Sequence, residues 1–215
     1  MIRATVFGGP KSRLRSYASP FHSGQVWIYH EPVKDTRKLS DFDVHHWRPG
    51  LRELYDRAMA ADAVAQTILA SHGGGGSWNK ALSLAEASLD ALENADEEVC
   101  SRIVVWFLWQ WAGFLGLMPE LDHCSSCAQP MAAGSMLWYS LQEGIIACGT
   151  CLEKDRGTVL EAGPGCRRWL ETIRNLPAVQ VPRYTLDEKS FRQAKVLVST
   201  IIAEALGRPL ACWEW

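Results

Sequence analysis

The chain has 215 residues and a mass of 24.0 kDa, which leaves room for one or two domains. A hydrophobic content of 47%, a charged content of 21% and a mean hydropathy of -0.09 exclude a predominantly disordered or fibrous protein. The formal net charge is only -2, but residues 1–52 carry nine basic and four acidic side chains, so we expect the N-terminal part to meet a polyanion.

The first 46 residues have the pattern of a small β unit. Apolar and polar residues alternate over Ile2–Phe7, as expected for a half-buried strand, and Gly8–Pro10 then indicates a turn. A second β-rich run covers Val26–Tyr29, and a third, weaker run ends at Val44. We therefore expect a β domain over residues 1–46.

Residues 47–215 have the pattern of a helical domain. Apolar side chains recur at steps of three and four over residues 51–69, which predicts a helix with one buried face. The glycines at 73–76 indicate a flexible turn before a second helix that starts near Trp78. A phosphate-binding loop is not expected there, because Ser77 and Trp78 follow the glycines in place of Gly-Lys-Ser/Thr.

The most apolar segment predicts the central helix. Asn94 with Glu97 three residues later has the pattern of a helix start, and the run that follows is apolar nearly all round. This run contains Trp106, Trp109 and Trp111. Exposed aromatic rings can stack on nucleic-acid bases, but the Ile, Val, Phe and Leu neighbours of these three favour packing in the core.

Two further helices are expected after the cysteine region, over residues 164–175 and 187–206. Thr185 with Glu188 forms a capping-box pattern at the start of the second one. The sequence 207–209, Gly-Arg-Pro, indicates its end.

Four of the seven cysteines form two Cys-x-x-Cys pairs separated by 20 residues, the spacing of a zinc ribbon. Two residues between cysteines allow a tight turn to direct both thiolates at one cation, and a second such turn completes a tetrahedron. Residues 136–141 and 144–147 are expected to form the hairpin that brings the pairs together. We therefore predict one structural zinc per chain, in a ribbon at about 121–155, bound by Cys124, Cys127, Cys148 and Cys151.

A redox dithiol is the alternative for these pairs, but such a motif normally begins a helix in a βαβ setting and has no second pair. The isolated cysteines are expected to be buried free thiols; they are Cys100, Cys166 and Cys212. Three histidines can bind metal but are not needed beside four thiolates; they are His45, His46 and His123.

Other chemistry has no support in the sequence. We find no Ser/His/Asp order, no paired acidic motif and no HExxH, so we do not expect an enzyme. The longest uncharged apolar stretch, residues 103–119, contains a glutamine, two glycines and a proline, so no membrane span is expected. The N-terminus lacks the pattern of a secretory signal, and we expect a cytoplasmic protein.

Several short motifs follow one another along the chain in an order that is typical of one family. The N-terminal ones are Gly8-Gly-Pro-Lys-Ser-Arg-Leu-Arg15, Pro20-Phe21, Phe42-Asp-Val44 and Pro49-Gly-Leu-Arg52. The later ones are Phe114–Asp122 running into the first cysteine pair, Glu143-Gly144 before the second pair, and Leu206-Gly-Arg-Pro-Leu210. Over essentially its whole length, the chain resembles the bacterial DNA repair family RecO.

The resemblance implies a non-enzymatic role in recombinational repair. RecO-like proteins bind single- and double-stranded DNA, anneal complementary strands, act with RecR and help RecA load on DNA coated by the single-strand-binding protein. The location implied is the nucleoid. The residues carried over to the DNA-binding surface are Arg3, Lys11, Arg13 and Arg15, with Lys34, Arg37 and Lys38 as weaker members.

The resemblance also shapes the predicted fold. Family members have about two strands before the one at Ile2–Phe7, which complete a five-stranded barrel, so an open sheet edge is expected here. The prediction is an α+β protein, in which a partial N-terminal OB-fold β-barrel precedes an α-helical domain that carries the four-cysteine zinc ribbon.

The C-terminal tail of the single-strand-binding protein resembles an acidic peptide with an apolar end, so its site should combine an apolar groove with cations. The candidates in the helical domain are Arg167, Arg168, Arg174, Arg192 and Lys195. A solvated helix face is the alternative, since Arg167 or Arg168 can pair with Glu171. The basic N-terminus can likewise be a solvated strand edge, and the second functional hypothesis is a zinc-ribbon interaction module without DNA binding.

Overall fold

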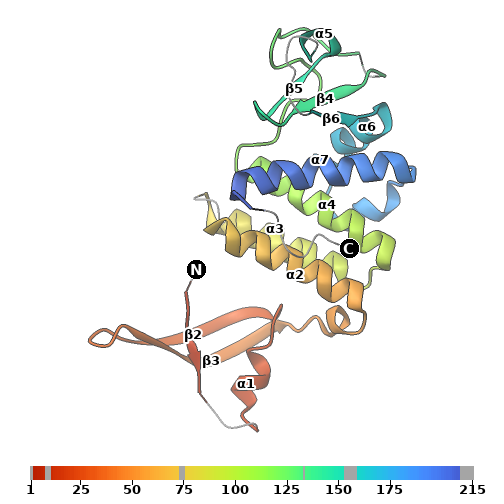
Figure 1. Ribbon diagram of the computed structural model, residues 1–215. Helices are drawn as coiled ribbons and strands as arrows, with labels where there is room; N and C mark the ends of the chain where they lie inside the picture. The colour runs from red at the N-terminus through yellow and green to blue at the C-terminus, as the bar shows by residue number, and fades with distance from the viewer. Residues whose placement is uncertain (1, 8–10, 73–75, 133, 153–158, 209–215) are drawn as a thin grey trace.

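The computed structural model describes residues 2–7, 11–72, 76–132, 134–152 and 159–208. They form an N-terminal β unit, a helical body and a small sheet that carries the cysteines, arranged one after another along the molecule (Figure 1). This arrangement confirms the expected mixture of small sheets and helices. No helix among the described residues is long and apolar enough to cross a membrane.

The N-terminal β unit is an open three-stranded sheet with one short helix. Its strand order is β1-β3-β2, with β1 parallel to β3 and β2 antiparallel to it. The expected second and third strands are present and longer than predicted, whereas the first is only two residues long. The described residues close no barrel. The elements are β1 (Thr5–Val6), α1 (Arg13–Tyr17), β2 (Ser23–Glu31) and β3 (Thr36–His46).

The change from sheet to helix falls between the end of β3 at His46 and a 3-10 helix that begins at Pro49. The helical body follows, with every predicted helix present. Its elements are η1 (Pro49–Arg52), α2 (Tyr55–Ala70), α3 (Trp78–Leu92), α4 (Glu97–Phe114), α6 (Pro164–Ile173), η3 (Ala178–Arg183) and α7 (Glu188–Leu206).

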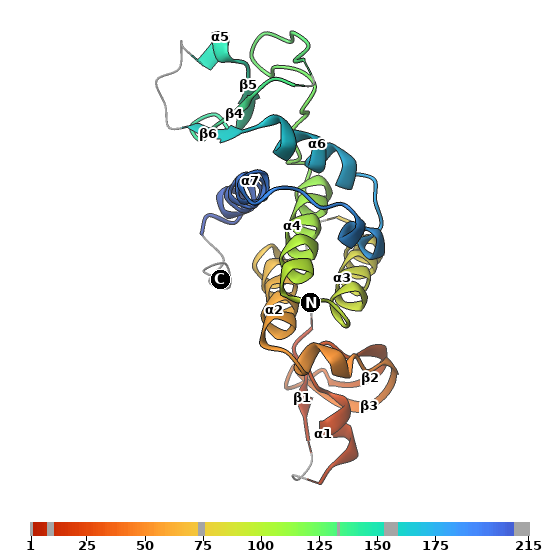
Figure 2. The same ribbon diagram turned by 90° about the vertical axis from the view of Figure 1, so that its right-hand side faces the viewer.

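Helix α4 lies at the centre of the body, and eleven of its eighteen residues are buried. Helices α2, α3 and α7 pack around it (Figure 2). Trp109 and Trp111 are fully buried, and the Trp109 Nε1–H donates to the carbonyl of Leu170 at 3.1 Å. Trp106 is 4% exposed and donates to the carbonyl of Leu176 at 2.9 Å. The expectation that these tryptophans pack in the core is therefore confirmed.

Two helix N-caps differ from the prediction. The N-cap of α4 is Asp96, whose carboxylate accepts from the Val99 N–H at 2.8 Å, and that of α7 is Asp187, which accepts from the Ser190 N–H at 2.9 Å. The capping residues predicted at Asn94 and Thr185 each lie two residues too early, although the helix predicted over residues 187–206 agrees with α7. An aspartate nearer the helix provides the acceptor for the first free N–H groups. The predicted end of α7 is confirmed, with Gly207 in the left-handed conformation.

The cysteine-bearing sheet has the order β5-β4-β6. The expected hairpin is formed by β4 (Leu137–Ser140) and β5 (Ile145–Ala147), which pair antiparallel. A third strand, β6 (Val159–Ala162), pairs with the other side of β4 and was not predicted. Between β5 and β6 lies the short helix α5 (Gly149–Leu152).

A buried arginine joins the β unit to the helical body. Arg48 is 2% exposed, and its Nε donates to a carboxylate oxygen of Asp90 on α3 at 2.6 Å. Its Nη1 donates to the carbonyl of Phe21 and to the hydroxyl of Ser23, both at 3.0 Å. One guanidinium therefore connects the start of β2, the segment after β3 and the bundle.

Replacing this arginine should loosen the β unit selectively. In Arg48→Met the Phe21 and Ser23 acceptors lose their donor, which we expect to cost about 2 kcal/mol. Amide exchange in β2 and β3 should accelerate about 30-fold at that cost, while exchange in α4 stays unchanged. Asp90→Asn keeps an acceptor and should have a smaller effect. Unchanged exchange in β2 and β3 of Arg48→Met would show that Arg48 does not hold this junction.

Candidate metal centre and nucleic-acid surface

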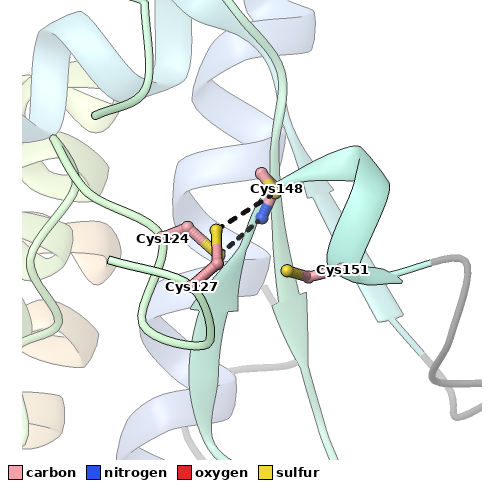
Figure 3. A group of neighbouring side chains, drawn as sticks. All are labelled: Cys124, Cys127, Cys148 and Cys151. Carbon is pink, nitrogen blue, oxygen red and sulfur yellow. Dashed lines mark hydrogen bonds between the residues drawn. The ribbon is translucent and has the colours of Figure 1, made fainter. Parts of the chain in front are cut away.

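The four cysteines predicted to bind metal meet at one end of the small sheet. All four sulfur atoms lie within 4.8 Å of one another, and the Cys127 and Cys148 sulfurs are 3.9 Å apart. Cys124 and Cys127 come from the loop before β4, Cys148 follows β5, and Cys151 lies on α5 (Figure 3). No other group of this kind occurs in the part of the chain that the structure describes.

Tight turns bring the cysteines of each pair together. In the first turn the Ala128 N–H donates to the carbonyl of Cys124 at 2.8 Å, and in the second the Cys151 N–H donates to that of Cys148 at 3.1 Å. The Cys148 N–H also donates to the Cys124 sulfur at 3.3 Å, which joins the two turns. The sequence predicted this convergence from the spacing alone.

The thiols differ in acidity. Burial raises the pKa of Cys124, but backbone N–H groups, that of Cys148 first, stabilise its thiolate and lower the pKa to about 6. The sulfurs of Cys127 and Cys148 hold the proton of Cys151 and raise its pKa to about 12. Because a metal ion must displace the proton of a thiol, Cys124 is more readily available as a ligand than Cys151.

The donor set fits zinc. Four thiolates about 2.3 Å from a central zinc would lie about 3.8 Å from one another, close to the separation of Cys127 and Cys148. Four sulfur ligands leave no open coordination position, so a metal bound there would stabilise the fold and not react with a substrate. The His123 ring lies outside the group, beside the Asp122 carboxylate at 3.0 Å.

The isolated cysteines are buried, as expected, where the structure describes them. Burial raises the pKa of Cys100 to about 11 and that of Cys166 to about 12, so both thiols stay protonated and unreactive. Cys212 lies outside the described residues.

The basic residues predicted to contact DNA fall into separate groups. Lys11, Arg13 and Arg15 are exposed on α1 and just before it, and Arg3 is exposed before β1. The sequence pattern predicted a strand and turn for these cations, whereas Arg13 and Arg15 lie on a five-residue helix, which is too short for its periodicity to be recognised.

The weaker candidates lie on the β2–β3 hairpin, whose turn points away from α1 (Figure 1). Lys34 lies 3.7 Å from a Glu31 carboxylate oxygen, and Arg37 pairs with Asp35 at 2.9 Å. The Lys38 ammonium lies 5.1 Å from the centre of the Phe7 ring. The hairpin cations are therefore partly neutralised, and the structure does not bring them to the α1 group.

Comparison with protein families gives a single clear result. The family model described as "Recombination protein O C terminal" matches residues 52–214, about three quarters of the chain. The chain belongs to the RecO family. This membership supports a role in DNA recombination and repair. A search of curated proteins gave no match. The matched RecO region covers the helical body and the cysteine-bearing sheet, and it begins after the β unit.

Two of the partner-binding candidates are engaged within this RecO-family structure. Arg167 is 3% exposed, donates to the carbonyls of Ala132 and Met131 at 2.6 and 3.2 Å, and pairs with Glu171 at 2.8 Å. The anticipated pairing with Glu171 is confirmed, and the guanidinium faces inward, where no surface ligand can reach it. Both terminal nitrogens of Arg174 lie 3.2 Å from Glu120 oxygens.

The remaining candidates differ in accessibility. Burial lowers the pKa of the half-buried Lys195, and Arg192 is exposed on α7. Arg168 is exposed and lines a cavity of about 280 Å³ between α6 and the segment before α7. Trp169, Tyr184 and Leu186 form much of the apolar wall, with Asp187 at one side.

Residues that are far apart in the sequence and meet only in the folded chain were not predicted. Arg48 and Arg167 looked like ordinary surface cations, and each is a buried donor to backbone carbonyls. The aromatic residues beside the α1 cations, Tyr17 and Trp47, were also missed. An exposed tryptophan next to basic residues was the available signal, but the partners are 30 residues apart in the sequence.

The cysteine cluster predicts the metal content. Protein purified without chelator should contain about one zinc per chain, and Cys148→Ser should lose it, because three thiolates bind the ion more weakly. The helical content should change little, since α4 packs among other helices. Ser126→Ala, between Cys124 and Cys127 in the other cysteine turn, is the control and should keep its zinc. Native protein without metal in elemental analysis would contradict the assignment.

Proposed function

We propose that this RecO-family protein is a recombination mediator that binds DNA through its β unit and anneals complementary single strands. The observation that carries the proposal is the family match, combined with the exposed cations Lys11, Arg13 and Arg15 on and just before α1. Annealing requires two phosphate backbones to be neutralised without fixing the bases, which suits a surface of exposed cationic side chains.

The proposal extends to the parts of the mediator. The β unit acts as a partial OB-fold, and the cysteine-bearing sheet is a zinc ribbon with a structural ion. The protein forms and breaks no covalent bond; it is not an enzyme. It works with RecR, and it helps RecA load on DNA coated by the single-strand-binding protein, at the nucleoid. Family membership and the exposed cations support these assignments.

An interaction module without DNA binding is the second candidate. One observation is compatible with it: the four-cysteine cluster lies in the part of the chain that the family model matches, apart from the α1 cations. Salt-dependent binding to DNA separates the two functions, because only the mediator releases counterions from a phosphate backbone.

The salt dependence of DNA binding tests the main proposal. In Lys11→Ala/Arg13→Ala/Arg15→Ala the affinity for any DNA sequence should fall, and the slope of log K against log salt should flatten by up to about three phosphate equivalents, each worth about 0.7 to 0.9. Lys34→Ala/Arg37→Ala is the matched control, since these cations already pair with Glu31 and Asp35, and its slope should change little. An unchanged slope in the triple variant would place the DNA site elsewhere.

We also propose that the cavity beside Arg168 receives the acidic tail of the single-strand-binding protein. Its apolar wall suits an apolar terminal residue, and the Arg168 guanidinium suits a carboxylate. In a titration with a tail peptide, Arg168→Ala should weaken binding about 10-fold, the equivalent of about 1.4 kcal/mol. Arg174→Ala is the control, because Arg174 already pairs with Glu120. Equal affinities for wild type and Arg168→Ala would show that the tail binds elsewhere than in the cavity beside Arg168.

A further inference from the structure

Five side chains beside α1 form a continuous series of ring and guanidinium contacts. The Arg13 guanidinium carbon lies 4.9 Å from the centre of the Tyr17 ring, and the Tyr17 ring lies 4.9 Å from that of Trp47. The Trp47 ring is in turn 5.0 Å from the His22 ring, and a His22 nitrogen bonds to Arg52. We call this set, Arg13, Tyr17, Trp47, His22 and Arg52, the cation–aromatic row.

The row is held by its own contacts and is still open to solvent. Tyr17 and His22 meet the indole of Trp47 at interplanar angles of 82° and 68°, so neither ring stacks flat on it. Trp47 remains 42% exposed, and the arginines at both ends are exposed. A large aromatic surface flanked by two cations is therefore accessible from outside.

The buried Arg48 places the row before any ligand arrives. It follows Trp47 directly in the chain, and its Nη1 bonds to Phe21 and Ser23, the residues on either side of His22. Arg52 also donates to the carbonyl of Trp47 at 3.3 Å. Because the rings are fixed in the free protein, a ligand that stacks on Trp47 would lose little binding energy in ordering them.

The chemistry of the row matches an unpaired nucleotide. An aromatic ring stacks on any exposed base, and guanidinium groups on either side pair with the neighbouring phosphates. In a duplex the faces of internal bases are covered by their neighbours, so the indole has no base face to contact. The row can therefore stack on single-stranded DNA but not on a duplex, whereas the α1 cations alone bind the phosphates of both forms.

Nearby acids restrict the path of the strand. A hollow of about 500 Å³ beside Arg13 and Tyr17 is also lined by Trp27, Asp41 and Asp43. The two aspartates would repel phosphates there. The favourable course for a strand runs over Trp47 towards Arg52.

We propose that Trp47, between Arg13 and Arg52, stacks on an unpaired base and gives the protein a preference for single-stranded over double-stranded DNA. This inference rests on the proposed function, since it requires the β unit to meet DNA. It adds a stacking site to the electrostatic surface formed by the α1 cations.

The test compares a single-stranded oligonucleotide with a duplex of the same length, for full-length wild type, Trp47→Ala and Trp47→Phe. Trp47→Ala should bind the single strand about 5- to 150-fold more weakly, from the usual value of one base–aromatic stack. Its affinity for the duplex should change less than about twofold. The slope of log K against log salt should stay the same, because no cation is removed. Trp47→Phe keeps a ring and should recover most of the single-strand affinity. Quenching of a 2-aminopurine base in the single strand should be strong with wild type and weak with Trp47→Ala.

Trp78→Ala is the matched control, because Trp78 is a similarly exposed tryptophan on α3, 50% exposed, outside the β unit. Equal losses of single-strand affinity in both alanine variants, or a Trp47→Ala variant that loses single strand and duplex to the same degree, would overturn the stacking site. An unchanged single-strand affinity in Trp47→Ala would also overturn the stacking site. In that case the proposed DNA binding by the α1 cations would remain valid if wild type binds DNA. A wild type that binds neither form would overturn the proposed function as well.

Discussion

The buried guanidinium of Arg48 is the interaction on which the arrangement of this molecule depends. Its three hydrogen bonds reach a carboxylate on α3, a carbonyl before β2 and a hydroxyl within it. Arg48 and Phe21 both have positive φ angles, 41° and 68°, a conformation that costs a non-glycine residue about 1 to 3 kcal/mol. The hydrogen bonds offset that cost and determine where the chain leaves the sheet.

The same junction has one unsatisfied donor and one very close contact. The Arg48 Nη2 is buried and has no hydrogen-bond partner among the described residues. Gly50, two residues on, lies against the end of α3, where a Cβ atom would come within 2.4 Å of the Glu93 carbonyl oxygen. The Arg48 guanidinium and the absence of a Cβ atom at Gly50 thus allow the sheet and the bundle to lie close together. Both determine the course of the chain from Trp47 to Arg52.

The cysteine-bearing sheet is attached to the bundle in a comparable way. Arg167 on α6 binds the carbonyls of Met131 and Ala132, in the segment that leads to β4. On β4 itself, the Tyr139 hydroxyl donates to the Glu204 carboxylate on α7 at 2.7 Å. Burial, followed by this carboxylate, raises the pKa of Tyr139, so the phenol remains a donor. The four cysteines lie together at the far end of the sheet, and these polar contacts hold the near end.

Features with a local physical cause could be predicted from the sequence. The strands β2 and β3, the helices and the β4–β5 hairpin follow from apolar periodicity, and the meeting of the cysteines follows from their spacing. Helix starts were misplaced where two capping patterns overlap, as at Asn94 and Asp96. Strand β6 and helix α1 are too short for a periodic signal.

The side chains that depend on tertiary packing could not be predicted. Whether Arg167 or Arg168 faces inward depends on the position of α6 against the segment at 131–132, which helical spacing does not reveal. In the cation–aromatic row, Arg13 and Arg52 are separated by nearly the whole β unit in sequence. Trp47 comes close to His22 only because the end of β3 pairs with the start of β2, and the sequence does not reveal this pairing.

The central position of α4 also has a consequence for the order in which the chain folds. Its buried side is covered partly by α2 and α3, which precede it, and partly by α7, whose buried Leu197, Val198, Ile201 and Ile202 come about 90 residues later. During synthesis the β2–β3 hairpin and the cysteine-bearing sheet have their own partners close by in the chain. Trp109 and Trp106 on α4 bond to Leu170 and Leu176, so this helix stays partly uncovered until those segments and α7 have left the ribosome, and the nascent chain is most prone to aggregate in that interval.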